Sequence, residues 1–192
     1  MSNIDESKYN QKIHPKKLLM WLCLGSIIML FTALLSAYIY KQSSGNWEYI
    51  ELPFSFLYNT VIIILSSVFF QLSLVNYKKG ENSKGRSFIL ITLLLSFSFL
   101  LGQYISWKEM MANNIYLIDP RSVSGSFVYI LTGLHALHII GGIIPLIWLN
   151  YKALKKAINS ASILGLEITL TYWHFLGALW LYIYLFLLVN QN

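Results

Sequence analysis

Five apolar runs, each long enough to cross a bilayer, account for most of the 192-residue chain. About 20 apolar residues in a helix span the hydrocarbon core of a membrane. The runs cover residues 18–40, 54–77, 87–107, 127–151 and 163–189. Short polar links separate them, so helices that follow one another in sequence are expected to be neighbours. The pattern predicts an all-α integral membrane bundle of five transmembrane helices over residues 18–192, preceded by a polar tail over residues 1–17.

Lysine and arginine gather in alternate links. Eleven of the 14 basic residues lie in the tail, between the second and third runs, or between the fourth and fifth runs; three lie in the other links. Basic residues mark the cytoplasmic side of a membrane protein. The N-terminus is therefore predicted to be cytoplasmic and the C-terminus to lie outside. The net charge of +6 then requires only anionic lipid headgroups as partners, and no nucleic acid.

The composition also limits the chemistry. Only 11% of residues are charged, compared with about 25% in soluble domains, which leaves no room for a separate soluble domain. The single cysteine, Cys23, excludes an intrachain disulfide and any paired-cysteine metal site. Four histidines are too few to hold two haems and a copper. We therefore expect no redox cofactor in this chain, and no metal unless the histidines inside the predicted spans bind one.

Four ionisable side chains lie inside the predicted spans: His135 and His138 in the fourth, Glu167 and His174 in the fifth. Such residues are costly in a membrane and usually face protein. The i, i+3 and i, i+7 spacings place each pair on one helix face. At about 1.5 Å per residue, His138 and His174 both lie near mid-membrane, where adjacent antiparallel helices would bring them together.

Three interpretations of these four residues remain open. They form an intramembrane polar network that fixes the register of two helices; or Glu167 serves a proton or lipid-headgroup site; or the three histidines and the glutamate bind a metal such as zinc or iron. Interhelical hydrogen bonds in membranes contribute about 0.6–2 kcal/mol each, and leaving such groups unpartnered costs more.

Several stretches resemble subunit III of cytochrome c oxidase. SFVYILTGLHALHIIGGIIPL is similar to that family's TGxHxxHVxxG signature, and GLEITLTYWHFLGALWLYIYLFL to its closing helix with a YWHFVDxxW motif. LPFSFLYNTVIIILSS resembles its proline-led helix, and the resemblance extends from residue 20 to the end. The chain is identified as a member in a short, five-helix bacterial form. The positions that match family motifs are Asn59, Thr60, Gln103, Thr132, Gly133, Gly142 and Trp173, besides His135, His138, Glu167 and His174.

The resemblance implies a non-redox subunit of a proton-pumping haem–copper oxidase that passes electrons from cytochrome c to oxygen. Such a subunit would stabilise subunit I, bind phospholipid and assemble with subunit II in a bacterial cytoplasmic membrane, with haem and copper in the partner subunits. Three family carboxylates are missing, at Ile27, Ser106 and Gly177. Their loss favours a scaffold and lipid-binding role over proton collection and leaves Glu167 as the remaining candidate.

Two other functions remain as alternatives. The chain is the same subunit in a quinol oxidase or a nitric oxide reductase complex, which would lack a copper-bearing, cysteine-paired subunit II. Alternatively, it is a small independent transporter, which would require a midplane substrate site and broken helices. Only Pro145, inside the fourth run, points towards a broken helix.

Overall fold

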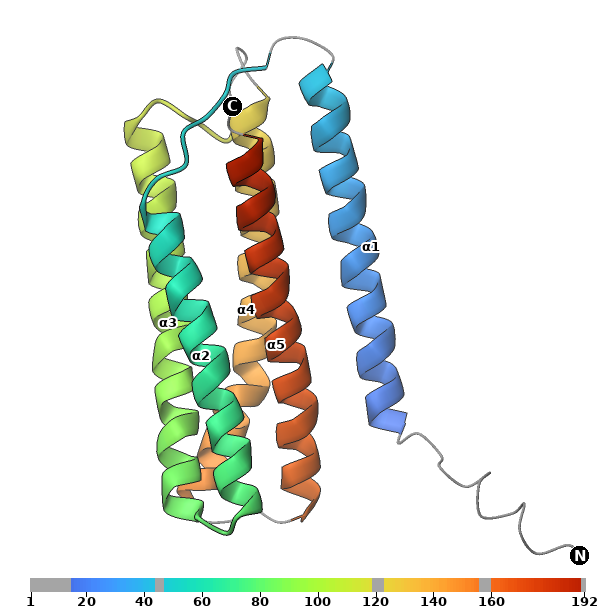
Figure 1. The fold of residues 1–192 in the computed structure, drawn as a ribbon, viewed down its shortest axis with the longest axis vertical. Coiled ribbons are helices and arrows are strands. Elements are labelled where there is room, and N and C mark those ends of the chain that lie inside the picture. The colour runs from blue at the N-terminus through green and yellow to red at the C-terminus, as the bar shows by residue number, and fades with distance from the viewer. Residues whose placement is uncertain (1–14, 44–46, 119–122, 156–159, 191–192) are drawn as a thin grey trace, which may run out of the picture.

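The computed structural model describes residues 15–43, 47–118, 123–155 and 160–190, without the side chains of residues 160 and 161. Its regular elements are five long helices (Figure 1). They are α1 (Pro15–Ser43), α2 (Ser55–Lys78), α3 (Asn82–Ala112), α4 (Ser124–Leu154) and α5 (Ser160–Val189). All five are long and apolar enough to cross a membrane, and the described residues contain no strand. The predicted all-α class with five membrane-spanning helices is therefore confirmed.

The helices extend beyond the apolar runs. The third run was expected to cover residues 87–107, whereas α3 covers 82–112, and α1 already begins at Pro15, within the expected tail. A helix can extend past the hydrocarbon boundary because its backbone groups remain hydrogen-bonded within the helix. The long polar side chains of these additional turns reach water. The rest of the predicted tail, residues 1–14, lies outside the described residues.

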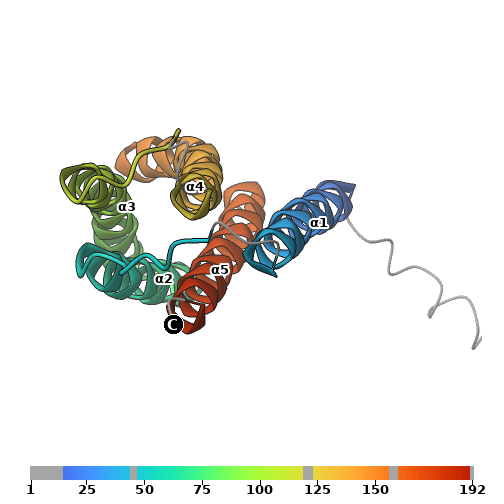
Figure 2. The same cartoon turned by 90° about the horizontal axis from the view of Figure 1, so that it is seen from above.

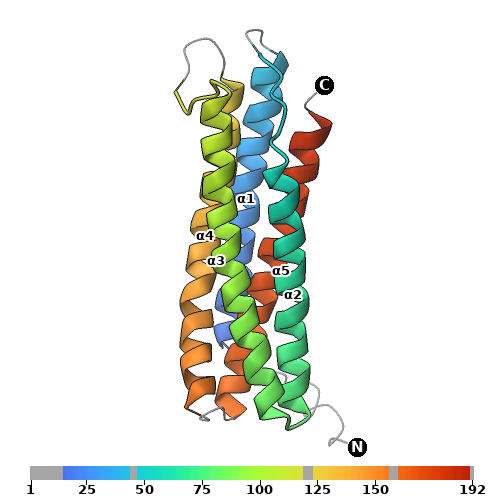
Figure 3. The same ribbon diagram turned by 90° about the vertical axis from the view of Figure 1, so that its left-hand side faces the viewer.

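Four of the helices form a closed ring, and α1 lies outside it. In the ring, α2 contacts α3, α3 contacts α4, α4 contacts α5 and α5 contacts α2, while α1 contacts only α4 and α5 among the helices. Figure 2 shows this arrangement from above, with α1 beside α5, and Figure 3 shows the long helices running roughly parallel along the bundle. The ring therefore provides most of the core, and α1 adds a partial second layer.

The α2–α3 hairpin is the tightest part of the ring. Gly80 adopts a positive φ of 81° in the connecting turn, a conformation that glycine adopts without strain. The first turn of α3 then packs closely against the last turn of α2. Gly85 permits this approach, since a Cβ at that position would lie 2.7 Å from the Tyr77 ring. Ser73 Oγ also donates to the Gly85 carbonyl at 2.8 Å. This hairpin fixes α2 relative to α3.

At the centre of the ring, each helix contributes one aromatic side chain. These are Phe56 of α2, Phe99 of α3, His135 of α4 and Trp180 of α5, and all four are completely buried. The Trp180 ring lies 5.9 Å from Phe56, 5.0 Å from Phe99 and 5.1 Å from His135, measured between centroids. We call these four residues the central aromatic cluster. It ties all four ring helices together at one level.

Candidate functional site

Three tryptophans join neighbouring helices through the same two-step hydrogen-bond relay. Trp180 Nε1 donates to Thr60 Oγ1 at 3.0 Å, and that hydroxyl donates to the Phe56 carbonyl at 2.9 Å. Trp173 Nε1 donates to Ser66 Oγ at 2.9 Å, and Ser66 donates onward to a backbone carbonyl of its own helix. An indole has one donor and a hydroxyl has one donor, so each relay satisfies its polar hydrogens inside the membrane.

The third relay joins α3 to α4. Trp107 Nε1 donates to Thr132 Oγ1 at 3.0 Å, and Thr132 Oγ1 donates to the Val128 carbonyl at 2.8 Å. Gly133 lies beside it, and a Cβ there would be in ordinary contact with the Trp107 ring at 3.8 Å. The family positions Thr60, Thr132 and Trp173 thus lie at helix–helix contacts.

The remaining family positions also lie where helices approach closely. Asn59 Nδ2 donates to Gln103 Oε1 at 3.4 Å across the α2–α3 contact. Gly102 allows this approach, because a Cβ at that position would collide with the Asn59 amide oxygen. On α4, a Cβ at Gly142 would lie 3.1 Å from the Trp173 ring. Small residues let helix backbones approach where lipid provides no hydrophobic driving force.

His135 and His138, one turn apart, both lie near Phe31 of α1 but differ in their other neighbours. His135 is in the central aromatic cluster, and neither ring nitrogen has a hydrogen-bond partner among the described residues. His138 points towards α1, with its ring centroid 5.7 Å from that of Phe31. Its Nδ1 lies 2.6 Å from the Leu134 carbonyl oxygen. A carbonyl only accepts, so Nδ1 carries the proton.

The structure does not bring His138 and His174 together, contrary to the expectation from their depths. The two helices are adjacent and antiparallel, but His174 faces α2, where its Nε2 lies 3.2 Å from Gln71 Oε1. The link that does join α4 to α5 here is Tyr172, whose hydroxyl donates to the His138 carbonyl at 3.2 Å. The rotation of α5 about its axis turns His174 towards α2 and Tyr172 towards α4.

Glu167 lies two turns below His174 and also faces α2. Its carboxylate is 2.7 Å from Lys78 Nζ and 3.8 Å from Lys17 Nζ of α1. Its side chain is 31% exposed. Lys17, Lys78, Glu167 and Trp21 line a cavity of about 410 Å³ between α1, α2 and α5, which we call the headgroup groove. Glu167 is therefore part of a charged, open groove and not of a network with the histidines.

The four ionisable residues thus occupy separate environments. Among the described residues, no group of three histidine, cysteine, aspartate or glutamate side chains is close enough to hold a metal ion. The three-histidine metal site that the sequence left open is not assembled. The hydrogen bonds of the buried helix contacts run instead through tryptophan, serine, threonine and amide side chains, and His174 takes part in one bond at the exposed α2–α5 edge.

Sequence reasoning missed several partners in these contacts: Gln71, Lys78, Trp107 and Trp180. Trp180 ends the YWHFVDxxW-like motif, which is a signal for it. The small Ser66–Ser67 pair predicts a close-packing face of α2, and both serines do lie at the α2–α5 contact. Gln71 and Lys78 give a weaker signal. They lie seven residues apart, which matches the spacing of Glu167 and His174.

The fold defines a class: a five-helix membrane protein in which a ring of four helices is closed by tryptophan–hydroxyl relays. Comparison with known proteins identifies the family, since cytochrome c oxidase subunit III matches residues 15–190. The probable cytochrome c oxidase subunit 3 of Mycobacterium tuberculosis is 29% identical over 168 residues, 82% of this chain and 79% of that protein. Cytochrome c oxidase subunit 3 of Corynebacterium diphtheriae is 26% identical, covering 82% of this chain and 80% of the relative. That of Allomyces macrogynus is 27% identical, covering 94% of this chain and 70% of the relative.

The chain belongs to the cytochrome c oxidase subunit III family. It is a subunit III of a haem–copper oxidase and hence part of an oxidase complex. With five helices able to cross a membrane, it is a multi-pass membrane protein.

Proposed function

We propose that this chain is a non-catalytic scaffold of a proton-pumping cytochrome c oxidase, stabilising subunit I and binding phospholipid. The observation that carries the proposal is the use of the polar side chains within the ring: the relays of Trp107, Trp173 and Trp180 all join helices. Side chains used in this way fix the positions of the helices and so the shape of the outer surface. They present no reactive atom to a substrate.

In this proposal, haem and copper lie in partner subunits. Haem iron and copper require histidine, cysteine or methionine ligands arranged around the metal. His135 is surrounded by aromatic rings, and His138 and His174 face different helices. These surroundings suit packing better than metal coordination.

The phospholipid role rests on the headgroup groove. It combines two ammonium groups, Lys17 and Lys78, with one carboxylate, Glu167, and an exposed indole, Trp21. The excess of positive charge suits a lipid phosphate, and tryptophan favours the membrane–water interface. Leu74, Leu170 and Met20 line the same cavity and would contact the upper part of the acyl chains.

We further propose that the protein lies in a bacterial cytoplasmic membrane with its N-terminus in the cytoplasm. The end of the bundle at which α1 begins, α2 meets α3 and α4 ends carries most of the described lysine and arginine; we call it the basic end. By the positive-inside rule, this end faces the cytoplasm. α4 is continuous through Pro145, which removes the one sequence feature that favoured a transporter with broken helices.

The test is a mild-detergent purification through an N-terminal tag, followed by subunit identification, an absorption spectrum and phospholipid analysis. We expect haem, subunit I and a copper-bearing subunit II to co-purify. A haem-containing complex without a copper-bearing subunit II would identify a quinol oxidase or nitric oxide reductase instead. A colourless, solitary protein would contradict the scaffold proposal and favour transport.

The same preparation tests the lipid site. Replacing both Lys17 and Lys78 with alanine is expected to lower the amount of anionic phospholipid retained per complex. The matched control replaces Lys79 and Lys84, which lie at the same end but outside the groove. Equal lipid retention in the two double variants would contradict the proposed site.

A further inference from the structure

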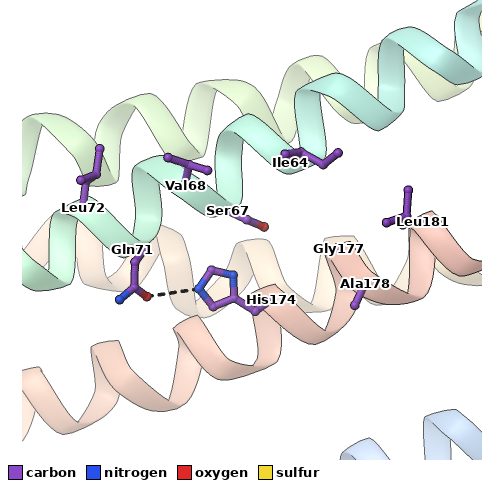
Figure 4. A pocket seen from close by; sticks show the side chains of 9 residues that line it. All are labelled: Ile64, Ser67, Val68, Gln71, Leu72, His174, Gly177, Ala178 and Leu181. Atoms are coloured by element: carbon purple, nitrogen blue, oxygen red, sulfur yellow. Dashed lines mark hydrogen bonds between the residues drawn. The ribbon is translucent and has the colours of Figure 1, made fainter.

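A groove on the outer side of the α2–α5 contact combines small and polar side chains within a largely apolar lining. Its volume is about 400 Å³, and it contains Ser67 and Gln71 of α2 and His174, Gly177 and Ala178 of α5 (Figure 4). We call it the His174 groove. A Cβ added at Gly177 would lie 3.1 Å from Ser67 Oγ, so the two helices approach closely beneath it. The result is a shallow channel with a floor of small residues.

The polar pair in this groove has unused hydrogen-bonding capacity. In Figure 4 the Gln71 amide and the His174 ring point towards each other across the groove. The one bond between them, 3.2 Å from Nε2 to Oε1, uses one ring nitrogen and one amide atom. A histidine ring has two nitrogen positions and an amide has two polar atoms. In either histidine tautomer, one nitrogen of the ring and one polar atom of the amide therefore remain available on an exposed face.

The depth of the pair decides what can use this capacity. Gln71 lies two turns from Lys78, and His174 lies two turns from Glu167, so the pair is about 10 Å further from the basic end than that ion pair. Lysine and glutamate side chains of this kind lie near the headgroups, which places His174 and Gln71 beside acyl chains. Acyl chains offer no hydrogen-bond partner at that depth, whereas a polar side chain of a neighbouring protein can bond to the free atoms of His174 and Gln71.

We propose that the His174 groove receives a transmembrane helix of the catalytic subunit. This inference rests on the scaffold function proposed above and adds the face that is used. The incoming helix would place an amide, hydroxyl or carboxyl oxygen within reach of His174 and Gln71. A bulky apolar side chain would lie over Gly177 and Ala178, because small residues admit close helix approach. Ile64, Val68, Leu72 and Leu181 form the rest of the lining and would pack against the apolar side of the incoming helix.

Site-specific photo-crosslinking in the intact oxidase complex tests the face directly. A photoreactive amino acid replaces Ala178, which is exposed in the groove, or Leu137 of α4, which is 63% exposed on another side. Both positions lie roughly 26 Å from the basic end of their helices, so depth is matched. We expect position 178 to cross-link to the catalytic subunit and position 137 to lipid alone.

Adverse results of this experiment are distinguishable from one another. An intact complex in which position 178 cross-links only to phospholipid, or in which position 137 captures the catalytic subunit instead, would overturn the proposed face and leave the scaffold function standing. If no oxidase complex is recovered even from the unsubstituted chain, the scaffold function fails, and the inference fails with it.

A pair of variants tests the role of the polar groups by the sign of their effect. Replacing Gln71 and His174 together with leucine removes the polar atoms but keeps bulk. If a partner helix bonds to them, the subunit should dissociate from the complex about tenfold faster, the factor that corresponds to one lost interhelical hydrogen bond. If they face lipid, removing them should leave dissociation unchanged or slow it, which would contradict the proposal. Leu137→Phe serves as the surface control.

Discussion

The two sides of the α2–α5 contact differ in what they do with their polar groups. On the inner side, Trp173 and Trp180 donate to Ser66 and Thr60. On the outer side, Glu167 pairs with Lys78, and His174 with Gln71. On both sides of this antiparallel contact the pairs repeat about every two turns. The same pair of helices therefore carries two sets of polar contacts with different surroundings.

The two sides differ in how many of their hydrogen-bond donors and acceptors are already used. Each inner relay ends on a backbone carbonyl of its own helix, so its polar hydrogens are all used. The outer pairs use side chains with several donors or acceptors, and each side chain keeps some of them free. A saturated contact can stabilise the bundle but cannot bind anything else. The unsaturated outer side is the one from which recognition of lipid or a partner helix is expected.

The largest effect should come from the inner side, at Trp180. Replacing Trp180 with alanine removes a side chain with no exposed surface from the central aromatic cluster and ends its bond to Thr60. Large-to-small substitutions at such positions cost about 3–5 kcal/mol because a cavity remains. Denaturant unfolding of the purified subunit in mixed micelles measures the free energy of unfolding. The control is Tyr182→Ala on the same helix, where the side chain is 57% exposed.

A loss similar to that of the Tyr182 variant would show that the cluster does not hold the ring together. The inner side would then be no more important for stability than the outer side, and the comparison between them would fail.

The sequence predicts the number and class of the helices because both follow from the apolar runs. It also finds Thr60, Thr132 and Trp173, through their motif positions. It does not predict which way each helix faces. The apolar residues of these helices are spread around all sides, so the usual polar and apolar faces do not set their rotation.

The two histidines of α4 show the consequence. An i, i+3 spacing separates them by about 60° around the helix, which sequence reasoning treats as one face. Because α4 borders both the interior of the ring and α1, that rotation is enough to bury His135 beside Phe99 and Trp180 and to leave His138 half-buried outside the cluster. Likewise, nothing in the sequence distinguishes Gly102 from the other residues of its apolar run. Its role becomes visible only in the structure, where the Asn59 amide lies against it.

A smaller effect distinguishes two consecutive serines of α2 that lie on the two sides of the α2–α5 contact. Ser66 accepts from Trp173 on the inner side, whereas Ser67 lines the His174 groove on the outer side. Ser66→Ala leaves a buried indole N–H without an acceptor and should cost about 0.5–1.5 kcal/mol in free energy of unfolding. Ser67→Ala should stay within about 0.5 kcal/mol. The same micelle unfolding assay compares them, and equal losses would contradict the inner–outer distinction.

The smallest effect belongs to the ion pair on the outer side. Lys78 and Glu167 are 53% and 31% exposed, so solvent screens them and their coupling should be under about 1 kcal/mol. A double-mutant cycle with Lys78→Ala and Glu167→Ala measures that coupling, and added salt should reduce it further. A salt-insensitive coupling above about 2 kcal/mol would mean that the pair is shielded from solvent in the folded subunit. The outer side would then stabilise the bundle as the inner relays do, and the two charges would not be available to bind a ligand. A weak, salt-sensitive coupling instead leaves both charges free to change partners, which a lipid headgroup between Lys17 and Lys78 requires.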